Sequence, residues 1–213
     1  MSNPLQGAQF VLAAHRISQL PHDSGGEVAF AGRSNAGKSS ALNALTGHRG
    51  LARTSKTPGR TQQMVAFSLP PLAQGEGQPP LEVRLIDLPG YGYAKVPPEL
   101  RDHWKQEIDA YLHQRRSLRG IVLISDIRHP MKEFDRMMLE FCFATHLPCH
   151  VLLTKADKVS RSQAAQALLS LRKELVAGGT QATAQVFSSS APTGVDEARE
   201  MVMTLLRTPR IEA

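Results

Sequence analysis

One short glycine-rich segment constrains the fold of this chain more than any other feature. Residues 32–39, Gly-Arg-Ser-Asn-Ala-Gly-Lys-Ser, match the pattern G-x-x-x-x-G-K-[ST]. An apolar run at Glu27–Ala31 precedes the segment and a helical pattern over Lys38–Leu45 follows it, which is the strand–loop–helix context of a P-loop. An accidental match is expected in roughly one chain of this length in a hundred. The context therefore favours a phosphate-binding loop over a functionless glycine-rich turn.

Each residue type in the segment has a physical reason to be there. The glycines let the backbone turn tightly, so that successive N–H groups and the positive end of the following helix face a phosphate chain. We expect Lys38 to place its charge on the β- and γ-phosphates, and the Ser39 hydroxyl to ligate Mg²⁺. The predicted phosphate-contacting residues are Gly32, Arg33, Ser34, Asn35, Ala36, Gly37, Lys38, Ser39 and Ser40.

A second motif, Asp87-Leu88-Pro89-Gly90, follows the apolar run Leu81–Ile86. An Asp at the end of a strand beside a P-loop can hold Mg²⁺ through a water molecule, and the Gly90 N–H can sense a γ-phosphate. Alone, D-x-x-G usually marks a turn after a strand. Its position about fifty residues after the P-loop favours the functional interpretation.

Two later segments are predicted to select the base. Thr154-Lys155-Ala156-Asp157 follows the apolar run Cys149–Leu153 and resembles the [NT]-K-x-D base-recognition motif of GTPases, with Thr where Asn is more usual. The Asp157 carboxylate can accept two hydrogen bonds from guanine that adenine cannot offer, while the Lys155 stem packs along the base. Phe187-Ser188-Ser189 ends the last predicted strand, where a backbone N–H can approach guanine O6. The alternative for this serine-rich turn is a simple N-cap of the final helix.

The loop Arg53–Gln62 is the predicted switch segment, which orders on a γ-phosphate and relaxes after hydrolysis. Thr61 is the first candidate to complete the magnesium shell because it lies nearest the following strand, and Thr57 is the alternative. A flexible basic loop is compatible with the same residues. The predicted nucleotide contacts here are Gly59, Arg60, Thr61 and Gln62.

The remaining pattern predicts an α/β chain with a three-layer P-loop GTPase fold: a mixed, mostly parallel six-stranded sheet with helices on both faces. We expect strands at 27–31, 62–69, 81–86, 120–124, 149–153 and 182–187, and helices at 38–45, 98–116, 132–145, 162–176 and 195–206. The Pro- and Gly-rich stretch 70–80 predicts a hairpin-type loop and thus one antiparallel pair. The GTPase domain is expected at 27–207, with a peripheral extension at 1–26 and a tail at 208–213.

Composition excludes several other classes of protein. The 213 residues are 41% hydrophobic and 21% charged, which is typical of one globular domain. No apolar run approaches the roughly 18 residues that span a bilayer, and we expect neither a signal peptide nor a lipid anchor. We therefore expect a cytoplasmic protein without stable membrane association. Cys142 and Cys149 lack metal-ligand spacing and indicate free thiols, and the net charge of +6 favours a polyanionic partner.

Five segments together resemble the EngB-type (YihA/YsxC) bacterial GTPases of the TRAFAC class: GRSNAGKSS, TPGRTQ, DLPGYGYAKV, TKADK and FSSSAPTGVDE. The resemblance runs from about Glu27 to Ala198, and DLPGYGYAKV is its most specific part. It implies a Mg²⁺-dependent GTPase that switches between GTP and GDP states in assembly of the large ribosomal subunit. It also implies contact with that subunit or its precursor through ribosomal RNA, a monomeric state, and a requirement for normal cell division and septation.

Two positions qualify the expected chemistry. Tyr91 stands where many signalling GTPases have a water-orienting Gln, so intrinsic hydrolysis should be slow. In related GTPases an Asn at the position of Asn35 helps to hold K⁺, which can add positive charge beside the phosphates; the alternative is that Asn35 only braces the loop. The predicted catalytic residues are Lys38, Asn35 and Thr61, and the predicted metal ligands are Ser39, Thr61 and, through water, Asp87.

Several interpretations stay open on sequence alone. Tyr91, Tyr93 and Lys95 either contact RNA or pack beneath the switch, and the basic residues Arg115, Arg116 and Arg119 are candidate phosphate contacts. A nucleotide-gated adaptor for a protein or membrane-site partner, with incidental hydrolysis, is the alternative function. A P-loop ATPase or kinase is a further rival, against which the TKAD segment argues.

Overall fold

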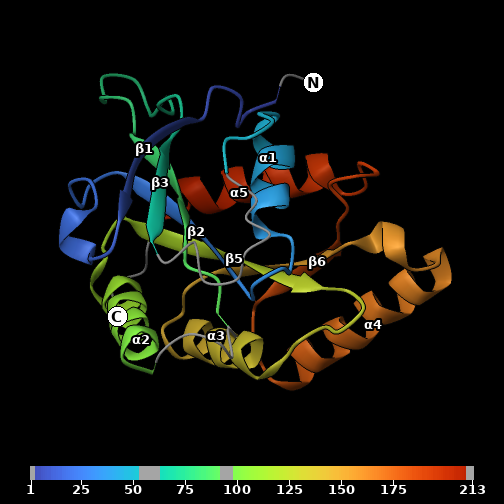
Figure 1. Cartoon of the computed structure of the whole chain (residues 1–213). Helices are drawn as coiled ribbons and strands as arrows, with labels where there is room; N and C mark the ends of the chain where they lie inside the picture. Colours follow the sequence, from blue (N-terminus) through green and yellow to red (C-terminus); the bar gives the residue numbers. More distant parts are fainter. Residues whose placement is uncertain (1–2, 53–62, 92–97, 210–213) are drawn as a thin grey trace.

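A seven-stranded mixed sheet lies between two layers of helices (Figure 1). The computed structural model describes residues 3–52, 63–91 and 98–209, with 98–105 described only by the course of their helix. The strands are β1 (Gln9–Ala14), β2 (Gly26–Gly32), β3 (Met64–Ser68), β4 (Val83–Asp87), β5 (Leu118–Asp126), β6 (Cys149–Thr154) and β7 (Thr183–Val186). The helices are α1 (Lys38–Thr46), α2 (Pro98–Gln114), α3 (Glu133–Ala144), α4 (Arg161–Ala177) and α5 (Val195–Arg207), with short 3₁₀ turns at Ile17–Gln19 and Ala156–Lys158.

The sheet runs in the order β1-β3-β4-β2-β5-β6-β7. β2, β4, β5, β6 and β7 are mutually parallel, and β3 is antiparallel to both β4 and β1. The expected three-layer α/β fold and the antiparallel β3–β4 pair are thus confirmed. Parallel strands bring their carboxyl ends to one edge of the sheet, so the loops that follow β2, β4, β6 and β7 gather there.

The central strand β2 is buried along its whole length because helices cover both of its faces. Val28 and Phe30 pack in the core beneath α1 and α5, whereas Ala29 and Ala31 pack in the core beneath α2, α3 and α4 (Figure 1). Successive side chains of a strand point to opposite faces, so each face needs its own apolar residues. This explains the continuous apolar run in the sequence.

The strand β1 corrects the expected count of six. It lies within the stretch that was predicted to be a peripheral extension, and it forms the outer edge of the sheet by pairing with β3. Phe10 and Val11 are exposed, while Leu5 just before the strand is fully buried. β1 is an edge strand with mostly exposed residues and a bulge between Phe10 and Leu12. Its sequence therefore lacks the alternation of polar and apolar residues by which a strand is recognised.

The amino-terminal edge of the sheet holds a buried ionic cluster. Glu27 at the start of β2 is fully buried and accepts hydrogen bonds from Arg84 Nε (3.0 Å), Arg115 Nη2 (2.7 Å) and the Tyr111 hydroxyl (3.2 Å). Arg119 donates to the carbonyl oxygens of Leu206 (3.0 Å) and Gly25 (3.3 Å). These contacts support structural roles for the buried Arg115 and the half-buried Arg119, whereas Arg116 is exposed and stays a candidate phosphate contact.

Candidate nucleotide-binding site

The glycine-rich loop connects β2 to α1 with the geometry that its sequence demands. Gly32 ends β2 so close to β5 that an added Cβ would lie 2.6 Å from the carbonyl oxygen of Ile124, so only glycine fits. Gly37 immediately precedes α1 with a φ of 103°, in the left-handed region that favours glycine. Lys38 and Ser39 then open the helix. The backbone is consequently arranged for N–H groups and a helix start to face a bound anion.

Lys38 and Asp87 meet at the centre of this edge. Asp87 is the last residue of β4 and pairs in register with Phe30 of β2, and its carboxylate forms an ion pair with the Lys38 ammonium. Both side chains are almost completely buried. Burial raises the pKa of Asp87, and the neighbouring Lys38 charge offsets part of that effect. The pair places one cation and one carboxylate where the sequence predicts phosphates and a metal ion.

The donor atoms around Lys38 suit Mg²⁺ and a phosphate chain. The Asp87 carboxylate and the Ser39 hydroxyl are hard oxygen donors of the kind that Mg²⁺ prefers. Ser34 Oγ is the one side-chain polar atom among the described residues that is buried without a hydrogen-bond partner. Buried polar atoms normally have a partner, so an unpaired hydroxyl within the P-loop fits a loop that receives a polar ligand.

The D-x-x-G turn lies directly against the P-loop. A Cβ added to Gly90 would lie 3.3 Å from both the N and Cα atoms of Ser34. The Ser34 N–H donates to the Tyr91 carbonyl oxygen (2.9 Å), and the Tyr91 N–H donates to the Gly32 carbonyl oxygen (3.4 Å). These bonds extend the parallel pairing of β2 and β4 beyond the strands, and they bring Gly90 next to the predicted phosphate site.

The Tyr91 side chain points into the protein. Its hydroxyl donates to Asp135 Oδ1 (2.6 Å), and its ring packs against Phe134 with the ring centroids 5.6 Å apart. Burial, together with the adjacent carboxylate, raises the pKa of Tyr91 well above its usual value, so the phenol remains a proton donor. Of the two interpretations of Tyr91, the structure supports packing and not an RNA-facing ring.

Thr154 and Lys155 fasten the predicted base-recognition loop to the P-loop. The Thr154 hydroxyl lies 2.5 Å from the Ala36 carbonyl oxygen and 3.1 Å from that of Ser125. Lys155 Nζ donates to the Asn35 carbonyl oxygen (2.6 Å) and to Asp126 (2.8 Å). The threonine that replaces the more usual asparagine of this motif therefore still braces the P-loop.

Asp157 and Ser188 bring the two predicted base-selecting segments together. Ser188 Oγ donates to Asp157 Oδ1 (2.7 Å) and accepts from the Ala191 N–H (3.1 Å). This hydroxyl contact, followed by the nearby Lys158, lowers the pKa of Asp157 to about 2. Asp157 is thus a carboxylate at neutral pH, ready to accept N–H groups. Ser188 is buried beneath the loop, whereas Ser189 next to it is exposed.

Asp126 and Asp135 belong to this site although the sequence analysis did not select them. Asp126 ends β5 and binds both Lys155 Nζ and the Arg128 guanidinium (2.7 Å). Burial would raise the pKa of Asp126, but these hydrogen bonds hold it well below its usual range. The position of Asp126 at the carboxyl end of an apolar strand was an available signal. Asp135 carried no such signal, because it lies inside a helical pattern.

The predicted switch residues Thr57, Gly59, Arg60, Thr61 and Gln62 lie outside the described residues, as do Tyr93 and Lys95. The choice between Thr57 and Thr61 therefore stays open. The other predicted segments do lie together: the P-loop, Asp87–Gly90, Thr154–Asp157 and Phe187–Ser189. Within the described part of the chain, no group of His, Cys, Asp and Glu side chains forms a separate metal cluster. There is also no helix there with the length and apolar character to cross a bilayer.

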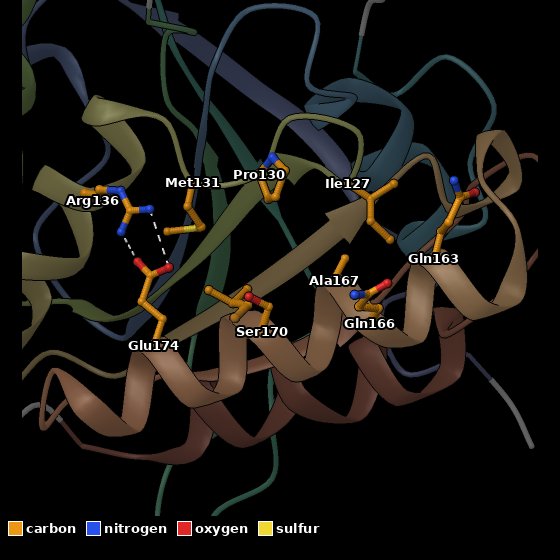
Figure 2. Close-up of a pocket in the computed structure, with 10 residues that line it drawn as sticks. Ile127, Pro130, Met131, Arg136, Gln163, Gln166, Ala167, Ser170 and Glu174 are labelled. Atoms are coloured by element: carbon orange, nitrogen blue, oxygen red, sulfur yellow. Dashed lines mark hydrogen bonds and ion pairs between the residues drawn. The ribbon is translucent and has the colours of Figure 1, made fainter.

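A separate cavity of about 480 Å³ lies between α3 and α4 (Figure 2). Met131 and Arg136 line it on the α3 side, and Ala167, Ser170 and Glu174 line it from α4. The Arg136 guanidinium and the Glu174 carboxylate form an ion pair across it. None of the predicted nucleotide contacts lines this cavity, so it is distinct from the P-loop site.

Comparison with known proteins places these features in a family. Residues 27–155 match the family model described as 50S ribosome-binding GTPase. The chain is 55% identical over 203 residues to the probable GTP-binding protein EngB of Stenotrophomonas maltophilia, covering 95% of this chain and 96% of that protein. It is 51% identical over 212 residues to the protein of the same name from Xylella fastidiosa, covering 99% of this chain and 100% of the other.

Solved structures share the fold at lower identity. A crystal structure of a probable GTP-binding protein engB has a TM-score of 0.61 at 21% identity, covering 85% of this chain and 98% of its own. The structure of Aquifex aeolicus Era bound to GDP.AlF4- has a TM-score of 0.65 at 20% identity, covering 89% of this chain and 58% of its own. At these identities the likeness establishes the α/β fold, while the sequence relatives carry the family assignment.

Proposed function

Because the chain belongs to the EngB family of GTP-binding proteins, we propose that it is a cytoplasmic, monomeric nucleotide switch that hydrolyses GTP slowly during assembly of the large ribosomal subunit. We further propose that cells need it for normal division and septation. The observation that supports nucleotide switching best is the convergence of the P-loop, the Asp87–Gly90 turn and the Thr154–Asp157 loop at one edge of the sheet.

Each residue of the site has a definite role in this proposal. Lys38 leaves Asp87 to neutralise the β- and γ-phosphates, and the P-loop N–H groups and the start of α1 bind the same oxygens. The Gly90 N–H faces the γ-phosphate. Asp157 accepts the ring N–H and the exocyclic amine of guanine, while the Ser188–Ser189 backbone lies near guanine O6. Thr154 holds the base loop and the P-loop in register.

Mg²⁺ is the proposed cofactor, and it supplies positive charge that offsets the charge developing on the transferred phosphate. Ser39 would bind it directly and Asp87 through water, with Thr61 or Thr57 completing the set. The oxygen donors of Ser39 and Asp87 fit such an ion. In this arrangement Lys38 and Asp87 exchange their mutual ion pair for contacts to the phosphates and the metal.

The surroundings of Tyr91 support the proposal that intrinsic hydrolysis is slow. The Tyr91 hydroxyl donates to Asp135, so it is not available to orient an attacking water molecule in place of the usual Gln. Asn35 is exposed at the phosphate end of the site, which supports the hypothesis that K⁺ binds there and accelerates hydrolysis. The hydrolysis rate in KCl should exceed that in NaCl at equal ionic strength, and equal rates would remove the potassium hypothesis.

The ribosomal part of the proposal is tested by co-sedimentation. The protein, loaded with GDP or with a non-hydrolysable GTP analogue, is centrifuged with large subunits, small subunits and their precursors at two salt concentrations. We expect binding to large-subunit particles only in the GTP-like state, and weaker binding at the higher salt, because phosphate contacts release counterions. If no particle binds in either state while guanine nucleotides still do, the alternative of an adaptor for a protein or membrane-site partner replaces the ribosomal proposal.

A further inference from the structure

The contact between Tyr91 and Asp135 joins the turn beside the phosphate site to the start of α3. The two residues lie 44 positions apart in the sequence, and the Tyr91 hydroxyl donates to Asp135 Oδ1 at 2.6 Å. Asp135 is 1% exposed, so the tyrosine reaches a carboxylate that has little access to water. A buried charge of this kind requires donors, which makes the hydroxyl more than a packing group.

The backbone of Tyr91 is held as firmly as its side chain. The Tyr91 carbonyl oxygen accepts from the Ser34 N–H at 2.9 Å, and the Tyr91 N–H donates to the Gly32 carbonyl oxygen at 3.4 Å. Gly90 precedes this residue and approaches Ser34 so closely that a Cβ would lie 3.3 Å from the Ser34 backbone. The position of Tyr91 therefore determines where the Gly90 N–H points relative to the P-loop.

The Asp135 carboxylate also organises the beginning of α3. Its Oδ2 atom accepts from the Lys132 N–H (3.1 Å) and the Ser125 hydroxyl (3.2 Å). Ser125 Oγ in turn accepts from the Met131 N–H (3.1 Å), at a residue whose φ of 52° lies in the left-handed region. Met131 and Arg136, on either side of Asp135 in the sequence, line the cavity between α3 and α4 (Figure 2). One chain of hydrogen bonds thus runs from the Gly90 turn to a wall of that cavity.

We propose that Tyr91 is a positioning residue whose hydrogen bond to Asp135 aims the Gly90 N–H at the γ-phosphate and couples the occupation of that position to α3. The inference rests on the proposed guanine-nucleotide switch and deepens it. Without the hydroxyl anchor, the Gly90 turn samples more orientations, and ordering it on a γ-phosphate costs conformational entropy. GDP has no γ-phosphate, so its affinity should not depend on the hydrogen bond between Tyr91 and Asp135.

The test compares two tyrosines that each donate a hydroxyl to a buried carboxylate. Tyr91→Phe removes the bond to Asp135, and Tyr111→Phe removes the 3.2 Å bond to Glu27 in the opposite ionic cluster. Affinities for GDP and for a non-hydrolysable GTP analogue are measured by titration. We expect Tyr91→Phe to lower the preference for the GTP analogue over GDP roughly tenfold, with GDP affinity retained. Tyr111→Phe should lower the thermal midpoint and leave the preference unchanged.

A second variant guards against a simple loss of folding. In Asp135→Asn the amide oxygen can still accept from Tyr91, while the amide NH₂ replaces Oδ2 and no longer accepts from Lys132 and Ser125. The preference for the GTP analogue should therefore fall less than in Tyr91→Phe. The double variant should be no worse than Tyr91→Phe alone, because both changes act on one contact. Hydrogen exchange of α3 (Glu133–Ala144) should differ between the GDP-bound and analogue-bound wild type, and this difference should disappear in Tyr91→Phe.

Failure of the inference and failure of the proposed function give different results. If the wild type binds both nucleotides but Tyr91→Phe keeps the wild-type preference, or additive losses appear in the double variant, the positioning role is wrong and the bond serves stability only. If the wild type binds neither guanine nucleotide, the proposed switch is wrong and the positioning role falls with it.

Discussion

At the scale of single residues, Asp157 illustrates how neighbours prepare a functional group. The Ser188 hydroxyl donates to one carboxylate oxygen and Lys158 lies 3.1 Å from the other. The Ser188 contact contributes most to lowering the pKa of Asp157 to about 2, so the group stays ionised well below neutral pH. Titration of Asp157 should accordingly cause no change in guanine affinity between pH 5 and 8. Ser188 thereby keeps Asp157 ionised even though its own side chain is buried.

Replacing Asp157 with Asn should change which base the protein prefers. The amide has only one acceptor oxygen and its NH₂ group faces the guanine amine, so affinity for GDP should fall at least about tenfold. Xanthine carries a carbonyl oxygen at the same position and should bind the variant better than it binds the wild type. The base preference is measured by displacing labelled GDP with either unlabelled GDP or xanthosine diphosphate. Asp196→Asn, at a side chain that is 89% exposed, is the matched control, and an unchanged base preference in Asp157→Asn would contradict the assignment.

At the scale of elements, the β6–β7 pair is joined by a buried histidine as well as by its backbone. His150 of β6 is hydrogen-bonded through Nδ1 to the Thr183 hydroxyl (2.7 Å) and through Nε2 to Gln185 Oε1 (2.9 Å), both from β7. A neutral ring that donates from Nε2 and accepts at Nδ1 satisfies all three groups. Burial lowers the pKa of His150, and the Arg172 charge lowers it further, although the Gln185 contact opposes them. Among the residues that the structure describes, no group of His, Cys, Asp and Glu that could hold a metal ion includes this histidine.

This histidine should make stability depend on pH. The unfolded ring takes up a proton below its ordinary pKa of about 6.5, whereas the folded ring resists protonation. The free energy of unfolding should therefore decrease as the pH falls from about 6.5 towards the lowered native pKa, by at most about 1.4 kcal/mol per pH unit. Urea unfolding of wild type and His150→Gln between pH 5 and 8 measures it. His150→Gln should lose this pH-dependent part of the free energy of unfolding, whereas the exposed-site control His129→Gln should keep it. Parallel pH profiles for the wild type and both variants would refute the role of His150.

At the scale of the whole molecule, the two edges of the sheet have separate tasks. The carboxyl edge carries the predicted nucleotide contacts, whereas the amino edge carries the Glu27 cluster. There Arg84 of β4 and Arg115 beyond α2 both bind Glu27. Arg115 also donates to the Pro21 carbonyl oxygen (2.7 Å). This cluster links the N-terminal segment, the central strand and the end of α2 through one buried carboxylate.

Removing the charge of Glu27 should therefore affect stability and spare nucleotide binding. Glu27→Gln removes the buried counter-charge that Arg84 and Arg115 share and leaves them only Glu82 (3.6 Å) and Asp23 (3.5 Å), both more exposed than Glu27. This loss should lower the free energy of unfolding by about 3–5 kcal/mol. The matched control is Glu82→Gln, because Glu82 also faces Arg84 but has a side chain that is 71% exposed; its cost should stay below about 1 kcal/mol. Urea unfolding and GDP titration at a temperature where both variants are folded give the two readouts. Equal stability losses, or a weakened GDP affinity in Glu27→Gln alone, would contradict this division between the edges.

The sequence by itself determined the motifs whose residues are neighbours in the chain. The P-loop, the D-x-x-G turn and the TKAD segment each depend on local spacing, and the strands and helices around them follow from apolar periodicity. Tertiary structure alone decided the contacts between distant segments: β1 with β3, Tyr91 with Asp135 across 44 positions, and Thr154 with Ala36 across 118. Such contacts depend on how layers pack and which strands become neighbours. No local pattern encodes them. The sequence around a tyrosine or an aspartate can be the same whether its side chain faces solvent or a buried partner.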